Sequence, residues 1–430
     1  MPSTSAARGV APLLASALRG FFNGCFPVRL RAWDGSEAGP AGAPAVVLHH
    51  RDALRHMLAK PGELGLARAY ISGTLEVQGD LTEGLRHVWK TIRAHGTSCP
   101  RPADWVRIGH VALVLGVVKT PPAPPAAEAR MRGMVNSRQR DARAIAHHYD
   151  ISSELYRILL DPSMAYSCGY WTSEDPSYTL IDAQSDKLDL VCRKLGLVTG
   201  DRLLDVGCGW GALSLHAARY YGARVTAITL STEQRDYVRS RIDTLGLGGR
   251  VEVRRQDYRD IADGPFDAVA SIEMGEHVGR RNYPLFASRL HASLRPGGRA
   301  LVQQMSRRGT APGGGPFIET YIAPDMHIRP VGATIDLLEE AGLEVRDVHA
   351  MREHYVRTAQ AWSDALENEF DAVVALVGTR TARMWRLYLA GGALTFEEGR
   401  MGVDQILSVR PLPGGGSGMP ATRSSLEVVH

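Results

Sequence analysis

A glycine-rich turn between an apolar segment and a helical pattern constrains the fold of this 430-residue chain more than any other feature. The apolar segment ends in Asp205-Val206, and Gly207, Gly209 and Gly211 then alternate with other residues. Glycine permits a tight turn and a close approach of the backbone to a ligand, and the helix that follows directs its positive end at the turn. The pattern therefore predicts a ligand site where a strand ends and a helix begins.

Strand-like segments alternate with helical patterns along the second half of the chain. They are Arg202–Val206, Arg224–Thr229, Val251–Gln256, Phe266–Ile272 and Arg299–Gln304. Such alternation is typical of a parallel sheet with helices on both faces. The turn reads Asp-x-Gly-x-Gly-x-Gly, which is typical of class I methyltransferases that use S-adenosylmethionine, whereas the dinucleotide pattern is Gly-x-Gly-x-x-Gly. We predict an α/β fold with a Rossmann-like sheet of the class I methyltransferase type.

A proline-rich stretch divides the chain. Proline at the density of residues 121–129 favours an extended spacer and excludes a helix. We predict a small N-terminal α+β domain over residues 1–120, a linker over 121–129, a methyltransferase domain over 130–412 and a flexible tail over 413–430. The segment Met384–Leu389 is expected to form a core helix, with Arg383 and Arg386 on its wetter face.

Composition excludes several classes of protein. Hydrophobic residues make up 44% and charged residues 22% of the chain, as in soluble globular proteins. Five cysteines without a Cys-x-x-Cys pair do not suggest disulfides or zinc, so we expect a reduced, cytoplasmic protein. The 50 basic and 46 acidic residues do not indicate nucleic-acid binding, although a local basic face for anionic lipid stays open.

Neither a membrane span nor a metal site is expected. The apolar run Val111–Val118 is too short to cross a bilayer. His147 and His148 lack a third ligand at a suitable spacing, so we predict no metal site.

Several residues are candidates for binding the cofactor. Asp205 is placed to contact the amino group of S-adenosylmethionine. The second strand lacks an acid at its end, where one normally holds ribose hydroxyls, so Thr229 and Gln234 are the available polar groups. Gln234 could instead complete a helix-capping box with Ser231, which would be purely structural.

The third and fourth strands supply further candidates. Asp257 suits the exocyclic amine of adenine and Tyr258 suits its face, with a solvated turn as the alternative for Asp257. Tyr166 and Ser167 are expected to border the cofactor. Ile272, at the end of the fourth strand, is the last of the predicted cofactor-binding residues.

Motifs in one order along the chain resemble cyclopropane-fatty-acyl-phospholipid synthases and the related mycolic acid methyltransferases. They cover residues 140 to 410 strongly and extend weakly into the N-terminal domain through Gly65–Gly73. The motifs are His148-Tyr149-Asp150, Tyr166-Ser167-Cys168, Leu204–Gly211, Thr229–Gln234, Gln256–Asp260, Glu276–Gly279 and Met384–Ala390.

The resemblance implies an activity and a site. Family members transfer a methyl group from S-adenosylmethionine to a cis double bond of a phospholipid acyl chain, through a carbocation that must be kept from water. A bound bicarbonate ion serves there as the base. Its ligands correspond to Cys168, Glu276 and Tyr355 in this chain, while Gln303 stands where the family has a histidine. Glutamine can donate a hydrogen bond but cannot titrate.

Each of these assignments has a second interpretation. Cys168 could be a small buried hydrophobe, and Glu276 a helix cap or an ion-pair partner. The resemblance implies a cyclopropane product, but Gln303 leaves a methylene- or methyl-branched chain open.

The substrate and the partner are also expectations at this point. The expected partner is an unsaturated phospholipid at a membrane surface, with peripheral membrane association. A small alkene, polyketide or terpenoid could be the substrate instead, and the chain could be a non-catalytic protein that binds the cofactor and lipid. A homodimer is left open.

Overall fold

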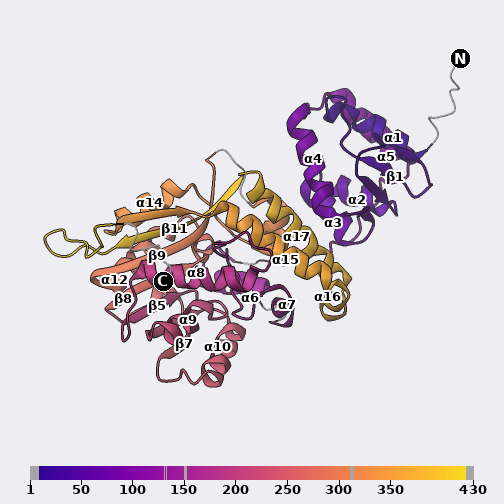
Figure 1. Ribbon diagram of the computed structural model, residues 1–430. Coiled ribbons are helices and arrows are strands. Elements are labelled where there is room, and N and C mark those ends of the chain that lie inside the picture. The colour runs from indigo at the N-terminus through magenta and orange to yellow at the C-terminus, as the bar shows by residue number, and fades with distance from the viewer. Residues whose placement is uncertain (1–8, 130, 132, 150–152, 310–313, 423–430) are drawn as a thin grey trace, which may run out of the picture. The chain divides into compact units, whose positions relative to one another are not determined.

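The computed structural model describes residues 9–129, 131, 133–149, 153–309 and 314–422. The chain divides into two compact units, which are considered separately (Figure 1). Unit 1 comprises Met1–Glu128 and Val374–Leu394, and unit 2 comprises Ala129–Val373 and Thr395–His430. The break after Glu128 lies at the end of the proline-rich stretch. Residues 374–394, which the sequence analysis placed in the methyltransferase domain, group with unit 1 instead.

Unit 1 is built on a small four-stranded sheet. Its strands are β1 (Arg29–Arg31), β2 (Glu37–Ala38), β3 (Ala45–Leu48) and β4 (Leu75–Val77), in the order β2-β1-β3-β4. The β1–β3 pair is parallel, and the other two pairs are antiparallel. The helices of its N-terminal part are α1 (Val10–Leu18), η1 (Arg19–Phe21), α2 (Asp52–Ala59), α3 (Glu63–Ile71), α4 (Leu81–His95) and α5 (Pro102–Val114).

A buried arginine ties the late segment into unit 1. Arg383 lies on α17 (Thr379–Glu397) and is 8% exposed. Its guanidinium donates to the carbonyl oxygens of Tyr70 and Leu75 and to the Glu76 carboxylate, and it lies 4.1 Å from the centre of the Tyr70 ring. The prediction that Arg383 faces water was therefore wrong, because these carbonyls at the end of α3 and in β4 need a donor.

Unit 2 contains a seven-stranded mixed sheet in the order β10-β11-β9-β8-β5-β6-β7. The strands β5 to β9 run parallel, whereas β11 is antiparallel to both β9 and β10. The strands are β5 (Arg202–Val206), β6 (Arg224–Thr229), β7 (Val251–Arg255), β8 (Phe266–Ile272), β9 (Leu294–Arg307), β10 (Glu344–Ala350) and β11 (Met401–Val409). The five strands β5 to β9 were predicted, and β10 and β11 were not.

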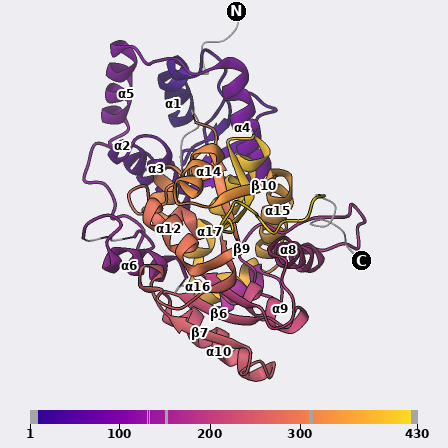
Figure 2. The same cartoon turned by 90° about the vertical axis from the view of Figure 1, so that its left-hand side faces the viewer.

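Helices cover both faces of this sheet, as predicted. The two faces form separate cores because side chains alternate along each strand: Leu203 packs with α8, α9 and α10, and Leu204 packs with α12 and α14. Figure 2 shows α12 and α14 on one side of β9, and α8 and α9 on the other. These five helices are α8 (Leu180–Leu195), α9 (Ala212–Tyr220), α10 (Thr232–Thr244), α12 (Tyr283–Ser293) and α14 (Val331–Glu340).

The remaining helical elements of the second half lie between or after the strands. They are α6 (Arg138–Tyr149), α7 (Ser153–Leu159), η2 (Tyr258–Asp260), α11 (Gly275–Val278), α13 (Gly315–Phe317), η3 (Ile318–Ile322), α15 (Arg352–Asn368) and α16 (Phe370–Val377).

We predict that Arg383→Met loosens unit 1 and leaves unit 2 unchanged. Methionine keeps the packing of the side-chain stem but removes the arginine's donors to the Leu75 carbonyl and the Glu76 carboxylate, while the Tyr70 carbonyl keeps the Gly73 N–H; the loss costs about 1–3 kcal/mol. Hydrogen exchange should accelerate at the amides of α3 and β4 and stay constant in β5 and β6. Arg380→Met, at an exposed position on the same helix, is the control. Unchanged protection of α3 and β4 in Arg383→Met would contradict the grouping of this segment with unit 1.

Candidate active site

A cavity opens at the carboxyl ends of β5, β6 and β8, where parallel α/β sheets bind their ligands. Its empty volume is about 1260 Å³, including the open mouth. Nine residues that the sequence analysis assigned to the cofactor line it: Tyr166, Ser167, Asp205, Gly207, Gly209, Thr229, Gln234, Tyr258 and Ile272. Gly211 and Asp257 were assigned to the cofactor as well, but they do not line the cavity.

The glycine turn adopts the backbone conformation that its sequence requires. Gly207, Gly209 and Gly211 have φ values of +80°, +53° and +88°, which side chains rarely adopt. A Cβ on Gly209 would meet no atom within 4 Å, so this residue leaves the cavity open. A Cβ on Gly211 would lie 2.9 Å from the side chain of Val238 on α10. Gly211 therefore serves helix packing. Gly207 lines the cavity but also allows the Met274 side chain to approach, since a Cβ there would lie 2.7 Å from it, and Gly209 alone of the three leaves open space.

Asp205 and a buried lysine form the polar floor of the cavity. The Asp205 carboxylate accepts a hydrogen bond from the Ser214 hydroxyl at 2.6 Å, and burial raises the pKa of Asp205 to about 6. Lys187 on α8 also lines the cavity, and its ammonium donates to the Ser167 hydroxyl at 2.7 Å. Burial lowers the pKa of Lys187, while the nearby carboxylates of Glu273 and Asp205 raise it. Ser167 thus serves to hold the lysine beside the cavity.

Gln234 forms only half of the capping box that the sequence suggested, because the Ser231 N–H donates to the Thr229 hydroxyl and not to the Gln234 side chain. Its backbone N–H donates to the Ser231 hydroxyl, which caps α10, and its side-chain oxygen accepts from the Thr229 hydroxyl at 2.7 Å. The side-chain nitrogen is buried and has no hydrogen-bond partner among the described residues. Because Gln234 lines the cavity, this amide is a donor for a ligand.

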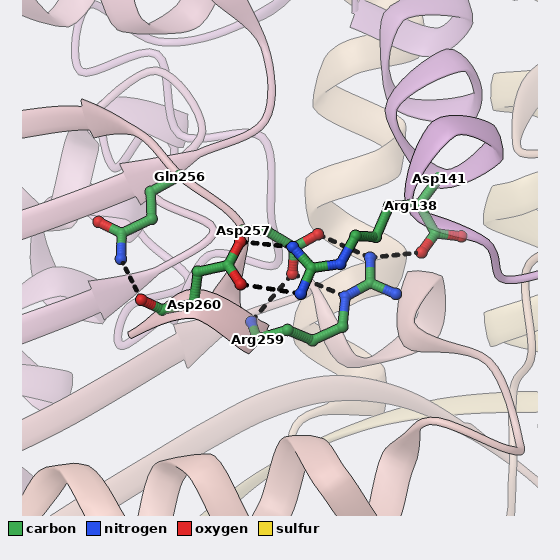
Figure 3. A network of polar contacts seen from close by, with 6 residues as sticks. All are labelled: Arg138, Asp141, Gln256, Asp257, Arg259 and Asp260. Atoms are coloured by element: carbon green, nitrogen blue, oxygen red, sulfur yellow. Dashed lines mark hydrogen bonds and ion pairs between the residues drawn. The ribbon is translucent and has the colours of Figure 1, made fainter. Parts of the chain in front are cut away.

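The third-strand turn differs from the expectation for Asp257. Its carboxylate accepts hydrogen bonds from the backbone N–H of Arg259 at 2.9 Å and from the guanidinium of the same residue at 2.6 Å (Figure 3). Both carboxylate oxygens of Asp257 therefore accept hydrogen bonds from Arg259. The cavity wall at this turn consists of Gln256, Tyr258 and Arg259. The Tyr258 hydroxyl is buried without a partner among the described residues.

Ion pairs hold α6 against the turn that follows β7. Arg259 also contacts the Asp141 carboxylate at 2.9 Å, and Arg138 donates to Asp260 at 2.8 Å (Figure 3). On the other side, Arg140 donates to Asp325 at 2.8 Å. Asp141 and Asp325 both line the cavity, so α6 forms one of its walls.

A carboxylate that the sequence analysis did not single out lies at the centre of the site. Glu273 follows β8 directly and lines the cavity. Its Oε1 accepts from the Cys168 backbone N–H and from the Gln303 side-chain nitrogen, both at 2.8 Å, and its Oε2 accepts from the Tyr355 hydroxyl at 2.7 Å. These four residues are called the Glu273 cluster below. Seclusion from solvent raises the pKa of Glu273, and the three donors and Lys187 lower it.

The three donors are themselves held in place. Gln303 is completely buried, and its oxygen accepts from the Gln405 side chain at 2.9 Å, which turns its NH₂ group toward Glu273. The ring of Tyr355 stacks on Phe396 with centroids 4.3 Å apart. Burial and the Glu273 carboxylate raise the pKa of Cys168 well above its ordinary value, so it remains a thiol and contributes its backbone N–H.

Glu276 does not join the residues with which the resemblance grouped it. It is 1% exposed, and one of its carboxylate oxygens accepts from the Met305 backbone N–H. The other has no partner among the described residues. Burial, and then the charge of Glu273, raise the pKa of Glu276 to about 8, so it is mostly protonated at neutral pH. The α11 turn directs Glu276 toward Met305 on β9, and the expectation that it shares a ligand with Cys168 and Tyr355 stays a prediction.

The sequence carried signals for the two residues that were missed. Glu273 is an acid immediately after an apolar strand, where ligand-binding side chains of α/β sheets stand. Lys187 lies on the buried face of α8, which also carries Ala183, Leu188 and Val191. A charge on such a face must be paired or hydrogen-bonded.

Two absences concern only the part of the chain that the structure describes. No group of three or more His, Cys, Asp or Glu side chains there could hold a metal ion. The side chains of His147 and His148 lie outside that part. Within it, every helix is too short or too polar to cross a membrane.

The fold and the glycine turn define a class I S-adenosylmethionine-dependent methyltransferase. A crystal structure of mycolic acid cyclopropane synthase CmaA1 complexed with S-adenosylhomocysteine and CTAB is similar, with a TM-score of 0.59 and 31% identity, and the match covers 62% of this chain and 97% of that one. Residues 136–406 match the family model of mycolic acid cyclopropane synthetase, and the chain belongs to that family.

Two curated relatives differ in how much of the chain they match. A probable fatty acid methyltransferase of Pseudomonas putida is 39% identical over 93% of this chain and 96% of its own length. The cyclopropane-fatty-acyl-phospholipid synthase of Escherichia coli is 33% identical over 62% of this chain and 68% of its own length.

The residues present fit S-adenosylmethionine. The cavity offers open space at Gly209, the unpartnered Gln234 amide and carboxylates at Asp205 and Glu273 for a ligand that carries positive charge. Gly207, Gly209, Asp205, Thr229, Gln234 and Tyr258 would hold it.

We predict that Gly209→Val weakens binding of S-adenosylhomocysteine by about 100-fold or more, because valine occupies ligand space. Isothermal titration calorimetry measures this. Gly246→Val is the matched control, since Gly246 has a φ of +66° and open surroundings but lies outside the cavity. Equal affinities of the two variants would show that the ligand does not lie against Gly209.

Proposed function

We propose that this enzyme transfers the methyl carbon of S-adenosylmethionine to a cis double bond in the acyl chain of an unsaturated phospholipid. The observation that carries the proposal is that the cavity and the Glu273 cluster share Glu273 as a common residue. A site for methylating an alkene needs a place for the methyl donor and a proton acceptor next to it. The names of the relatives supply the acyl substrate.

The surroundings of the cluster suit a cationic intermediate. When bound, the cofactor supplies an electrophilic methyl group on a sulfonium. Tyr166 in the cavity wall lies 5.1 Å from the ring of Trp362, which meets Tyr355 edge to face at 6.0 Å. Aromatic faces attract cations and exclude water. A carbocation beside them would therefore survive long enough to lose a proton.

The product follows from where the cation stands when it loses that proton. Loss from the transferred carbon with closure onto the neighbouring cation gives a cyclopropane, the product implied by the family resemblance. If a hydride first shifts between the two former alkene carbons, the same loss gives a methylene branch. A saturated methyl branch also needs a reductant. The methylene branch is the second candidate, because the relative that matches nearly the whole chain is named a fatty acid methyltransferase.

The test is incubation of the full chain with methyl-deuterated S-adenosylmethionine and vesicles of dioleoyl phosphatidylglycerol. Mass spectrometry should find labelled acyl chains that are heavier by one methylene group, and catalytic hydrogenation under mild conditions separates the ring from the branch. Dipalmitoyl vesicles, which lack a double bond, should gain no label. Label in soluble alkenes but not in oleoyl chains would contradict the lipid substrate.

We further propose that unit 1 binds the surface of an anionic membrane through α5. Trp105, Val106, Leu113 and Val114 on this helix are 52–73% exposed. Unit 1 contains 17 basic and nine acidic residues, a net charge of +8, whereas unit 2 contains 33 and 37, a net charge of −4. Basic residues beside an apolar helix face favour anionic headgroups. The total charge of the chain is thus close to neutral although unit 1 is strongly basic.

Leu113→Glu with Val114→Glu should reduce co-sedimentation with phosphatidylglycerol vesicles by about tenfold, through lost apolar contact and charge repulsion. Wild-type binding to phosphatidylcholine vesicles should be weak. Val198→Glu, at an exposed apolar position in unit 2, is the control. Light scattering on the same variants decides whether α5 is a face between two copies of the chain. A change in oligomeric mass with unchanged vesicle binding would refute membrane docking.

A further inference from the structure

The Glu273 carboxylate has one acceptor position left. A carboxylate can accept about four hydrogen bonds, two at each oxygen. Two donors at Oε1 and one at Oε2 leave a single lone-pair position at Oε2 among the described residues. The side chain keeps some exposed surface, and it lines the cavity. The open position is therefore available to a proton that arrives from a ligand in the cavity.

The backbone at Glu273 is in a conformation that a glutamate rarely adopts. Its φ is +51°, in the left-handed region, which costs a residue other than glycine about 1 kcal/mol or more. Its N–H donates to the Gln303 carbonyl at 2.6 Å, which anchors the turn to β9. Glycine would fit this position without strain, so the carboxylate is retained at a cost in stability. Strain of this kind points to a role for the side chain.

We propose that Glu273 is the general base of the methyl transfer and that this enzyme therefore works without bound bicarbonate. The inference rests on the proposed function and names the proton acceptor that the reaction needs. The electron pair of a C–H bond on the transferred carbon becomes the last bond of the ring or the second bond of the methylene group. The proton passes to Oε2 of Glu273 and then to solvent.

Bicarbonate does not fit the residues that the resemblance assigned to it. The Cys168 N–H, the Gln303 amide and the Tyr355 hydroxyl all donate to Glu273 instead. A second anion beside Glu273 would meet that negative charge without these donors. Gln303 also fits this arrangement, because a neutral donor suffices for a carboxylate that is covalently held.

Charged and titratable groups from four elements surround the base. Burial raises the pKa of Glu273, and its hydrogen bonds and the charge of Lys187 on α8 offset only part of that rise. Tyr355 on α15 donates to Glu273, and Cys168 precedes α8 in the chain. Glu276 on α11 is a second carboxyl nearby and is mostly neutral. Of the two carboxyl groups on this turn, Glu273 lines the cavity and Glu276 does not, so Glu273 is the base that faces a ligand.

The test compares Glu273→Gln, Glu273→Gly and Glu276→Gln in the full chain. Glu273→Gln should lower the rate of methyl transfer by about 100-fold or more, because it cannot accept the proton. Its affinity for S-adenosylhomocysteine should stay within about threefold, since a neutral amide replaces one wall residue. Glu276→Gln should lose far less activity, because Glu276 lies outside the cavity wall.

Glu273→Gly provides a readout that does not depend on turnover. Glycine relieves the left-handed strain but leaves three donors without their acceptor, so circular dichroism first establishes that the variant is folded. The substitution exposes the three donors, so the NMR line of ¹³C-bicarbonate should broaden with this variant and stay sharp with the wild type. Added bicarbonate should also restore part of its activity.

Two results would overturn the inference. The first is near-normal turnover in Glu273→Gln. The second is binding of bicarbonate to the wild type through Cys168, Gln303 and Tyr355. If the wild type methylates no unsaturated lipid, the proposed function fails, while the bicarbonate-binding comparison still decides whether Glu273 fills the anion position.

Discussion

The site depends on one constraint, which is that a carboxylate secluded from bulk solvent must have its lone pairs satisfied. Glu273 meets this constraint by drawing donors from three separate parts of unit 2: the segment before α8, the strand β9 and the helix α15. Each donor is fixed in turn, Gln303 by Gln405 on β11 and Tyr355 by its stack on Phe396. The antiparallel strand β11 thus supports the chemistry as well as the sheet.

The parallel part of the sheet could be predicted from the sequence because its strands are apolar runs with regular spacing. The edge strand β10 and its neighbour β11 could not, since Glu344–Ala350 is mostly polar and lies at the edge of the sheet, and Met401–Val409 follows a long helical stretch. The grouping of residues 374–394 with unit 1 depends on long-range contacts of Arg383, which no local pattern encodes.

The cofactor pocket was predictable because the glycine turn fixes the backbone, and most of its neighbours followed by position. Asp257 was misjudged because the partner of its carboxylate, Arg259, can be identified only from the folded turn. The family resemblance pointed to Glu276, and Glu273 was not considered, because the sequence does not show which of two acids on one turn faces the cavity. The left-handed backbone at Glu273 decides this, and it is visible only in three dimensions.

The two units differ in net charge, which is consistent with the different tasks proposed for them. A basic unit with an apolar helix face suits an anionic lipid surface, whereas the weakly acidic unit 2 encloses the reacting groups. In the proposed reaction, the alkene and the methyl donor meet in that unit away from water, beside Glu273 as the base. The most direct measurement of this account is the initial rate of methyl transfer by the wild-type enzyme in buffer stripped of carbon dioxide, compared with the same buffer containing bicarbonate. Equal rates are predicted, and a rate that collapses without bicarbonate would contradict the central claim.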